Sequence, residues 1–268
     1  MSKHIVCYSG GHSSALVAIE VVRRFGKDNV VLLNHDINPN TENEDIKRFK
    51  LEVASYLGIK ITYANHVTWN TSDQFDVSIE AKAFKVGNGT ALCTNRLKTA
   101  PFEKWLELNY PDKDCIVYYG FDINEKARIQ RRSSILALKG YKTDYPLALW
   151  ERTIQTTKEI NIEPPNSYSI WKHANCTGCL KAGKQHWYLV YLHRPDLWEK
   201  AKRAEDIIGY SILKDVYLYE LEEDFDKLKC NGVETTEHED GRTFMARARK
   251  IINIKQEDLF EKPCECFV

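Results

Sequence analysis

The first stretch of this chain whose residues could do chemistry is a serine- and glycine-rich turn near the N-terminus. It follows the apolar pair Ile5-Val6 and precedes a segment with apolar residues at helical spacing. Adjacent glycines leave no side chain between the backbone amides and a ligand, and a helix beginning there directs its positive end to the same place. The expected ligand is a phosphate, although a plain glycine turn has the same pattern. The residues are Ser9, Gly10, Gly11, His12, Ser13 and Ser14.

A second chemical feature is the cysteine pair Cys176 and Cys179, two residues apart on a glycine-containing turn. Two thiolates at this spacing can bind one metal centre, and sulfur ligands favour zinc or an iron–sulfur cluster. Further ligands must come from distant parts of the chain, and the candidates are Cys93, Cys264 and Cys266. A redox dithiol and a pair of buried thiols without a shared role remain open as alternatives.

A third cluster is basic and follows the turn Gly120-Phe121. Arg128, Arg131 and Arg132 recur at helical spacing, so two of them share a helix face and can approach the same anion. A solvent-exposed basic face without a ligand is the alternative interpretation.

Apolar runs that alternate with helical segments predict the elements that position these residues. Strands are expected at 30–33, 59–63 and 115–121, and helices at 44–57 and 125–137. Strands and helices joined by short links predict a parallel sheet covered by helices on both faces, a Rossmann-like α/β fold. Ligands of such folds gather at the carboxyl ends of the strands, where the serine-glycine turn would lie.

The rest of the chain has a different pattern. We expect a nucleotide-binding domain over 1–145 and a smaller, mostly helical region with the cysteines over 146–268. Within the second region, a short helix is expected at 154–163 and an amphipathic helix at 187–210. Residues 69–88 have no clear period and are interpreted as a partly ordered excursion.

Composition limits the possible functions. The 268 residues are 43% hydrophobic with a formal net charge of zero, so any nucleic-acid surface must be local or supplied by a partner. The N-terminus has no signal-peptide pattern and no segment is long enough to span a bilayer, which predicts a cytoplasmic protein without a membrane partner. In that compartment the eight cysteines are expected as thiols, metal ligands or catalytic groups.

The turn Ser9 to Ser14 resembles the pyrophosphate loop, Ser-Gly-Gly-x-Asp-Ser, of the N-type ATP pyrophosphatases and the related phosphoadenylylsulfate (PAPS) reductases. This resemblance implies an adenine nucleotide alpha hydrolase-like fold that binds ATP and Mg²⁺ and cleaves ATP between its α and β phosphates. Ser13 stands where most ATP-cleaving members have Asp, a departure that bears on magnesium binding and hydrolysis. The catalytic residues that the resemblance implies are Ser9, Ser13, Lys98 and Arg128.

Two other segments resemble nucleotide-binding parts of the same family. Asn34-His35-Asp36 resembles its second strand end, whose backbone meets adenine, and Asp36 would add a ribose or magnesium contact. A structural Asp–His pair is the alternative. The segment after the fourth expected strand resembles the second phosphate-binding motif, with Lys98 nearby; its residues are Gly120, Phe121, Arg128, Arg131 and Arg132.

The cysteines resemble those of cluster-bearing family members. Cys93 opens a Cys-Thr-x-x-Leu-Lys stretch, and together with Cys176 and Cys179 it implies a [4Fe-4S] cluster with Cys266 as a further ligand. Glu265-Cys266 also matches part of the reactive tail of PAPS reductases, without the Gly-Leu-His that follows there.

Size and motif order look most like the sulfur-transfer subunit of bacterial DNA phosphorothioation systems, which act in phage defence. The implied partners are a cysteine desulfurase as sulfur donor, other subunits of a DNA-modification complex, and DNA as substrate. Three alternatives stay open: a PAPS reductase-like thiol-dependent reductase, a tRNA thiolation enzyme, and a non-catalytic nucleotide-binding subunit.

Overall fold

The computed structural model describes residues 2–35, 41–85, 91–174 and 176–253. The chain divides into two compact units. Unit 1 comprises Met1–Thr71 and Thr94–Tyr168, and unit 2 comprises Ser72–Cys93 and Ser169–Val268. The expected boundary after residue 145 therefore lies inside unit 1. Because the chain leaves unit 1 and returns to it, one change of pattern along the sequence cannot mark this division.

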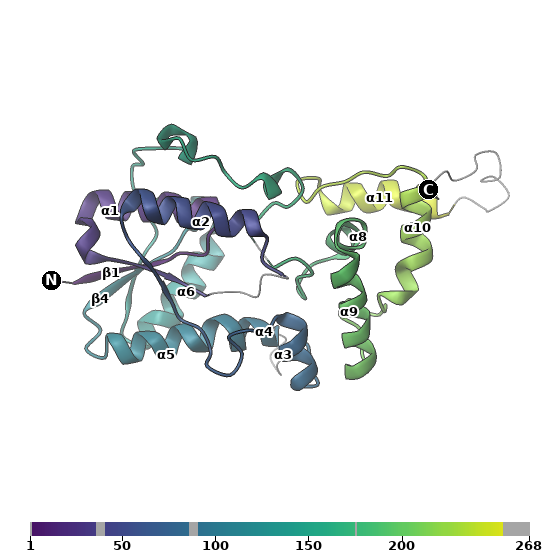
Figure 1. The fold of residues 1–268 in the computed structure, drawn as a ribbon, viewed down its shortest axis with the longest axis horizontal. Helices are drawn as coiled ribbons and strands as arrows, with labels where there is room; N and C mark the ends of the chain where they lie inside the picture. The colour runs from purple at the N-terminus through teal and green to yellow at the C-terminus, as the bar shows by residue number, and fades with distance from the viewer. Residues whose placement is uncertain (1, 36–40, 86–90, 175, 254–268) are drawn as a thin grey trace. The chain divides into compact units, whose positions relative to one another are not determined.

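Unit 1 contains a five-stranded parallel sheet in the order β3-β2-β1-β4-β5, which confirms the predicted fold class (Figure 1). In the register, Val6 of β1 lies opposite Leu32 of β2 and Tyr118 of β4. The strands are β1 (Lys3–Cys7), β2 (Val30–Asn34), β3 (Ile61–Tyr63), β4 (Cys115–Tyr118) and β5 (Lys142–Asp144).

Helices cover both faces of this sheet. Successive side chains of β1 point to opposite faces, so Val6 packs with α1 and α2 whereas Ile5 packs with α5 and α6. Figure 1 shows α1 and α2 above the strands and α5 below them. The longer helices are α1 (His12–Phe25), α2 (Glu44–Leu57), α5 (Ala100–Asn109) and α6 (Lys126–Leu138); short helical segments are Lys27–Asn29, Ile123–Glu125 and α7 (Pro146–Leu149). The short α4 (Leu92–Thr94) begins in unit 2 and ends in unit 1.

Two segments of unit 1 differ from the sequence-based expectation. β5 was not predicted, because its Lys-Thr-Asp sequence lacks an apolar run and it forms an edge strand. The expected helix at 154–163 is only a 3₁₀ turn at Thr157–Ile160, ended by Asn161 in the left-handed conformation. A π-helical segment, Asn95–Thr99, precedes α5.

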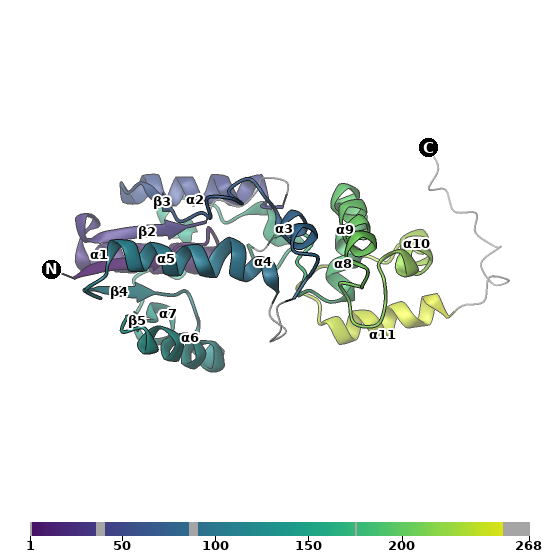
Figure 2. The ribbon, with the colours of Figure 1, turned by 90° about the horizontal axis from the view of Figure 1, so that it is seen from below.

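Unit 2 is built mainly of helices (Figure 2). Its core is rich in aromatic residues, among them Trp187, Trp198, Phe225 and Phe244. The expected single helix at 187–210 is two helices, because Pro195 cannot continue the first and begins the second. Its elements are α3 (Gln74–Glu80), Asn166–Ser169 at the junction of the units, α8 (Lys184–His193), α9 (Pro195–Ile208), Tyr219–Leu221, α10 (Glu222–Cys230) and α11 (Gly241–Ile252).

The segment 69–88, interpreted as an excursion, contains α3. Asp73 caps this helix by accepting from the amides of Phe75 and Asp76, and the Asp76 side chain accepts from the Asp73 amide in return. Phe75 and Phe84 belong to the core of unit 2. Across the described ranges, no helix has both the length and the apolar character that crossing a bilayer requires.

Candidate nucleotide site and cysteine turn

The serine-glycine turn connects the carboxyl end of β1 to α1. Gly10 has φ +83°, and a Cβ there would lie 3.2 Å from Ile46 Cγ2 and 3.2 Å from Lys50 Cδ. The Ser14 hydroxyl donates to the Gly11 carbonyl at 2.8 Å, and the Ser9 hydroxyl donates to Ser14 Oγ at 3.3 Å. Gly11, the N-cap residue of α1, has no side chain that could cap the helix. The turn therefore combines a close backbone approach with the positive end of a 14-residue helix.

The turn after β4 lies directly against this helix start. A Cβ on Gly120 would lie 3.1 Å from Ser13 C and 3.1 Å from Ser14 N, so a side chain there would push against the backbone of the turn. β1 and β4 are neighbours, and the helices that follow them cover opposite faces of the sheet. This is the switch point of a doubly wound sheet, the usual position of a ligand in such folds. The structure thus brings together the two glycine turns that the sequence singled out.

His12 contributes differently from expectation. Its Nε2 accepts from the Thr157 amide at 3.3 Å, so the imidazole is engaged by the segment after α7. Burial, and then the positive charge of Arg152, lower the pKa of His12. Its backbone amide, which we expected at a phosphate, donates to Tyr168 Oη at 3.0 Å. A ligand at this amide has to replace the tyrosine hydroxyl.

We therefore expect Tyr168→Phe to raise nucleotide affinity, because the variant frees the His12 amide without removing the ring. One hydrogen bond changes affinity by about two- to tenfold. Calorimetric titration of ATP into both proteins measures the change, with Tyr56→Phe on the exposed face of α2 as the matched control. Weaker binding to Tyr168→Phe would show that the hydroxyl supports the ligand.

A buried ion pair beneath the turn was not found by sequence reasoning. Lys50, 1% exposed, lies 3.3 Å from Glu42 Oε2 and donates to Asn34 Oδ1 at 3.2 Å. Asn34 in turn donates to the Tyr8 carbonyl, and the Tyr8 hydroxyl donates to the Lys50 carbonyl at 2.8 Å. Asn34 thus holds the end of β1 rather than facing solvent. The sequence feature that could have indicated this ion pair is the position of the lysine on the apolar face of α2, between Phe49 and Val53.

The arginines of α6 lie over aromatic rings. Arg128 stacks on Phe121 at 4.3 Å and forms an ion pair with Glu125. Arg132, one turn further, lies 5.5 Å from the ring of Tyr119. Arg128 and Arg132 thus share a face, as their spacing predicted. Arg131 is exposed.

Lys98 lies in the π-helical segment, within electrostatic reach of the end of β2. Burial is the main cause that lowers the pKa of His35 to about 4, and the positive charge of Lys98 adds to it, while a hydrogen bond with the Ala64 carbonyl opposes it. Asp36, the predicted ribose or magnesium ligand, lies outside the described residues.

The cysteine turn, residues 176–179, is hydrogen-bonded from two sides by side chains of unit 2. The amides of Gly178 and Cys179 donate to His186 Nε2 at 3.1 and 3.2 Å, and His186 Nδ1 lies 2.5 Å from Glu237 Oε1. From the other side, Gln74 Nε2 donates to the carbonyls of Thr177 and Gly178 at 2.8 and 3.2 Å. His186 therefore organises the turn through its backbone. The sequence showed this histidine near the cysteines but not its role.

Three of the predicted metal ligands, Cys93, Cys176 and Cys179, lie in the described part of the chain; they belong to unit 2 and are half-buried. Among the described residues, no group of three or more histidine, cysteine or acidic side chains is arranged to hold a metal ion. Cys266 lies outside those residues. The predicted cluster thus stays a prediction, and no reaction step is derived through it.

The His186–Glu237 pair gives an expected pH dependence. Burial raises the pKa of Glu237, but the hydrogen bonds that the carboxylate accepts from His186 and from the Lys172 amide outweigh it, and the pKa stays below the ordinary glutamate value. The pKa of Glu237 is lower in the folded protein than in the unfolded chain, where it is about 4.3, so the ionised carboxylate stabilises the fold above that pH. This stabilisation is lost as the pH falls through the pKa of the folded protein.

Glu237→Gln is therefore expected to melt at a lower temperature than wild type at pH 7, and the difference should shrink towards pH 3.5. Thermal unfolding followed by circular dichroism measures both. Glu234→Gln, at an exposed position nearby, is the control. A difference that is constant with pH would contradict the assignment.

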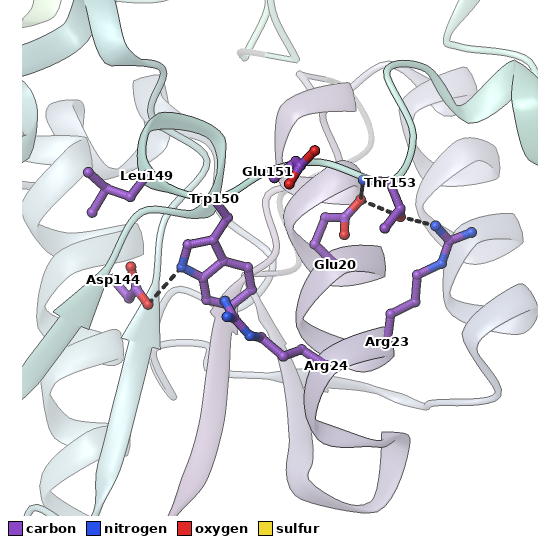
Figure 3. Close-up of a pocket in the computed structure, with 8 residues that line it drawn as sticks. All are labelled: Glu20, Arg23, Arg24, Asp144, Leu149, Trp150, Glu151 and Thr153. Atoms are coloured by element: carbon purple, nitrogen blue, oxygen red, sulfur yellow. Dashed lines mark hydrogen bonds between the residues drawn. The ribbon is translucent and has the colours of Figure 1, made fainter.

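A pocket of about 730 Å³ lies beside the C-terminal half of α1 (Figure 3). Several of its polar groups already bind one another. Glu20 accepts from the Thr153 amide and hydroxyl at 2.8 and 2.7 Å, Arg24 stacks on Trp150 at 4.5 Å, and Trp150 Nε1 donates to Asp144 at 3.2 Å. None of the predicted site residues within the described ranges lines it.

Comparison with known proteins gives one distant relationship. Over 208 residues the chain is 25% identical to the uncharacterized nin region protein ORF290 of Escherichia phage lambda, covering 68% of this chain and 67% of that protein. No model of a known protein family and no solved structure matches the chain.

Proposed function

We propose that this protein binds ATP at the serine-glycine turn and cleaves it between the α and β phosphates to activate a substrate for sulfur transfer. The observation that supports this proposal is the contact between Gly120 and the Ser13–Ser14 backbone at the switch point of the sheet. The two backbone turns and the N-terminus of α1 meet there. Such a cradle suits a polyphosphate.

In the proposed reaction, a substrate oxygen attacks the α-phosphorus, the bond between that phosphorus and the bridging oxygen breaks, and pyrophosphate leaves. The amides of the turn and the hydroxyls of Ser9 and Ser13 would bind the phosphates. The exposed Arg128 would exchange its Glu125 partner for a phosphate oxygen. The outer sulfur of a persulfide formed by a cysteine desulfurase would then attack the activated phosphorus and displace AMP, and a thiol reductant would break the remaining S–S bond to leave the sulfur on phosphorus. The acceptor we propose is the DNA backbone.

The test is the fate of ATP labelled in its α-phosphate, incubated with the protein, Mg²⁺, DNA and a desulfurase with cysteine. Labelled AMP, with DNA resistant to nuclease at the modified linkage, is the expected result. Cys176→Ala should still bind ATP but yield no modified DNA. Labelled ADP, or binding without cleavage, would overturn the proposal; binding alone would indicate a nucleotide-binding subunit, and thiol-dependent reduction of PAPS a reductase.

A further inference from the structure

A separate cavity of about 630 Å³ lies wholly within unit 2. Its wall is formed by residues 172–173, the start of α8, part of α11 and Glu237. The volume lies within the range of small-molecule sites, about 300–1,000 Å³. Neither the proposed nucleotide site nor the predicted metal ligands include a residue of this wall.

Three cationic side chains, Lys172, Lys184 and Arg249, line this cavity. Within the described part of the chain, none of the three forms an ion pair. They contrast with Arg24 and Glu20 in the pocket of Figure 3, whose charges are already engaged. Cations without an ion-pair partner around one concave surface favour an anionic ligand.

Glu237 is the carboxylate of this wall, and its oxygens are already used. One lies 2.5 Å from His186 Nδ1 and the other accepts from the Lys172 amide at 2.9 Å. His186 Nε2 accepts from two amides, which places the ring proton on Nδ1, directed at Glu237. The wall thus carries three formal positive charges against one negative, a surplus of two before His173 is counted.

The start of α8 adds backbone donors to these cations. Gly183 precedes this ten-residue helix without a side-chain cap, and no atom lies within 4 Å of the position that a Cβ would occupy there. The first amides of α8 can therefore reach a ligand from the open side. Ala182 and Met245 give the same wall an apolar part.

We propose that this cavity binds a phosphate monoester. Its phosphoryl group, with two negative charges near neutral pH, matches the surplus charge and contacts Lys184, Arg249 and the first amides of α8. The organic part packs on Met245. Arginine and backbone amides are suited to several phosphoryl oxygens at once, which favours a phosphate over a carboxylate.

The experiment follows amide resonances of the full chain during titration with inorganic phosphate and with glycerol 3-phosphate. We expect the Gly183 and Gly241 amides to shift, with tighter binding of the ester. Lys184→Gln or Arg249→Gln should each weaken binding about tenfold, as for a lost charge-assisted hydrogen bond. Lys250→Gln, exposed beside Arg249 but absent from the wall, is the matched control and should bind as wild type.

Unshifted Gly183 and Gly241 resonances, or unchanged affinity in a folded Lys184→Gln/Arg249→Gln double variant, would overturn the proposal. A DNA oligomer with a 5′-phosphate, compared with the same oligomer without it, identifies the source of the monoester. Binding only with the phosphate indicates a strand end, and binding of glycerol 3-phosphate alone indicates a small metabolite. Equal binding of both oligomers would contradict a monoester site. ATP-induced shifts at Gly10 and Gly11 report separately on the proposed function.

Discussion

Gly120→Val is expected to abolish ATP binding while leaving the protein folded. A Cβ at this position already lies 3.1 Å from the backbone of Ser13 and Ser14, and the two methyl groups of valine would force the turns after β1 and β4 apart. Overpacking of this kind costs about 1–3 kcal/mol, and displacement of the amides removes the phosphate contacts as well. We expect at least a hundredfold loss of affinity.

Calorimetric titration with ATP measures this loss, and far-ultraviolet circular dichroism checks the fold. Ala137→Val, exposed on α6, adds the same two methyl groups without a neighbouring turn and is the matched control. ATP binding by Gly120→Val at wild-type affinity would place the nucleotide elsewhere and remove the main support for the proposed function.

Lys50→Met should destabilise unit 1 by about 1.5–3 kcal/mol, because it removes the buried ammonium group that lies 3.3 Å from the Glu42 carboxylate. Methionine keeps the aliphatic stem that packs under Gly10. Urea unfolding measures the loss. Combining Lys50→Met with Glu42→Gln removes the carboxylate charge as well and should recover part of the loss.

The control for this pair is Lys47→Met. Lys47 lies 3.7 Å from the same Glu42 oxygen but is 27% exposed, and pairs with that much solvent contribute at most about 1 kcal/mol. If Lys47→Met and Lys50→Met lowered the free energy of unfolding equally, the burial of Lys50 would contribute nothing to stability.

The sequence was sufficient to predict the parallel sheet and its two glycine turns. Local patterns carried this information: the apolar runs of β1, β2 and β4 are continuous, and Gly58 ends α2 in the left-handed conformation. β5 escaped prediction because an edge strand of three polar residues has no such pattern.

The site was predictable only in part, because its remaining features depend on tertiary contacts. Tyr168 lies 156 residues from the amide of His12 that it accepts from. Lys50 and Glu42 become a buried pair only when α2 packs against the turn. Likewise, hydrogen bonds connect Glu237 to His186 and His186 to the cysteine turn. These residues lie in different segments, and no repeating pattern in the sequence relates them.

Unit 2 is formed by two separate stretches of the chain, which are synthesised at different times. Residues 72–93 leave the ribosome well before the C-terminal helices against which Phe75 and Phe84 pack. During synthesis these aromatic rings stay exposed to solvent until the C-terminal helices have formed. An exposed apolar surface favours association with other chains or with a chaperone. A fragment ending at Tyr168 would keep that surface permanently, so unit 1 can be isolated only by replacing residues 72–93 with a short polar linker.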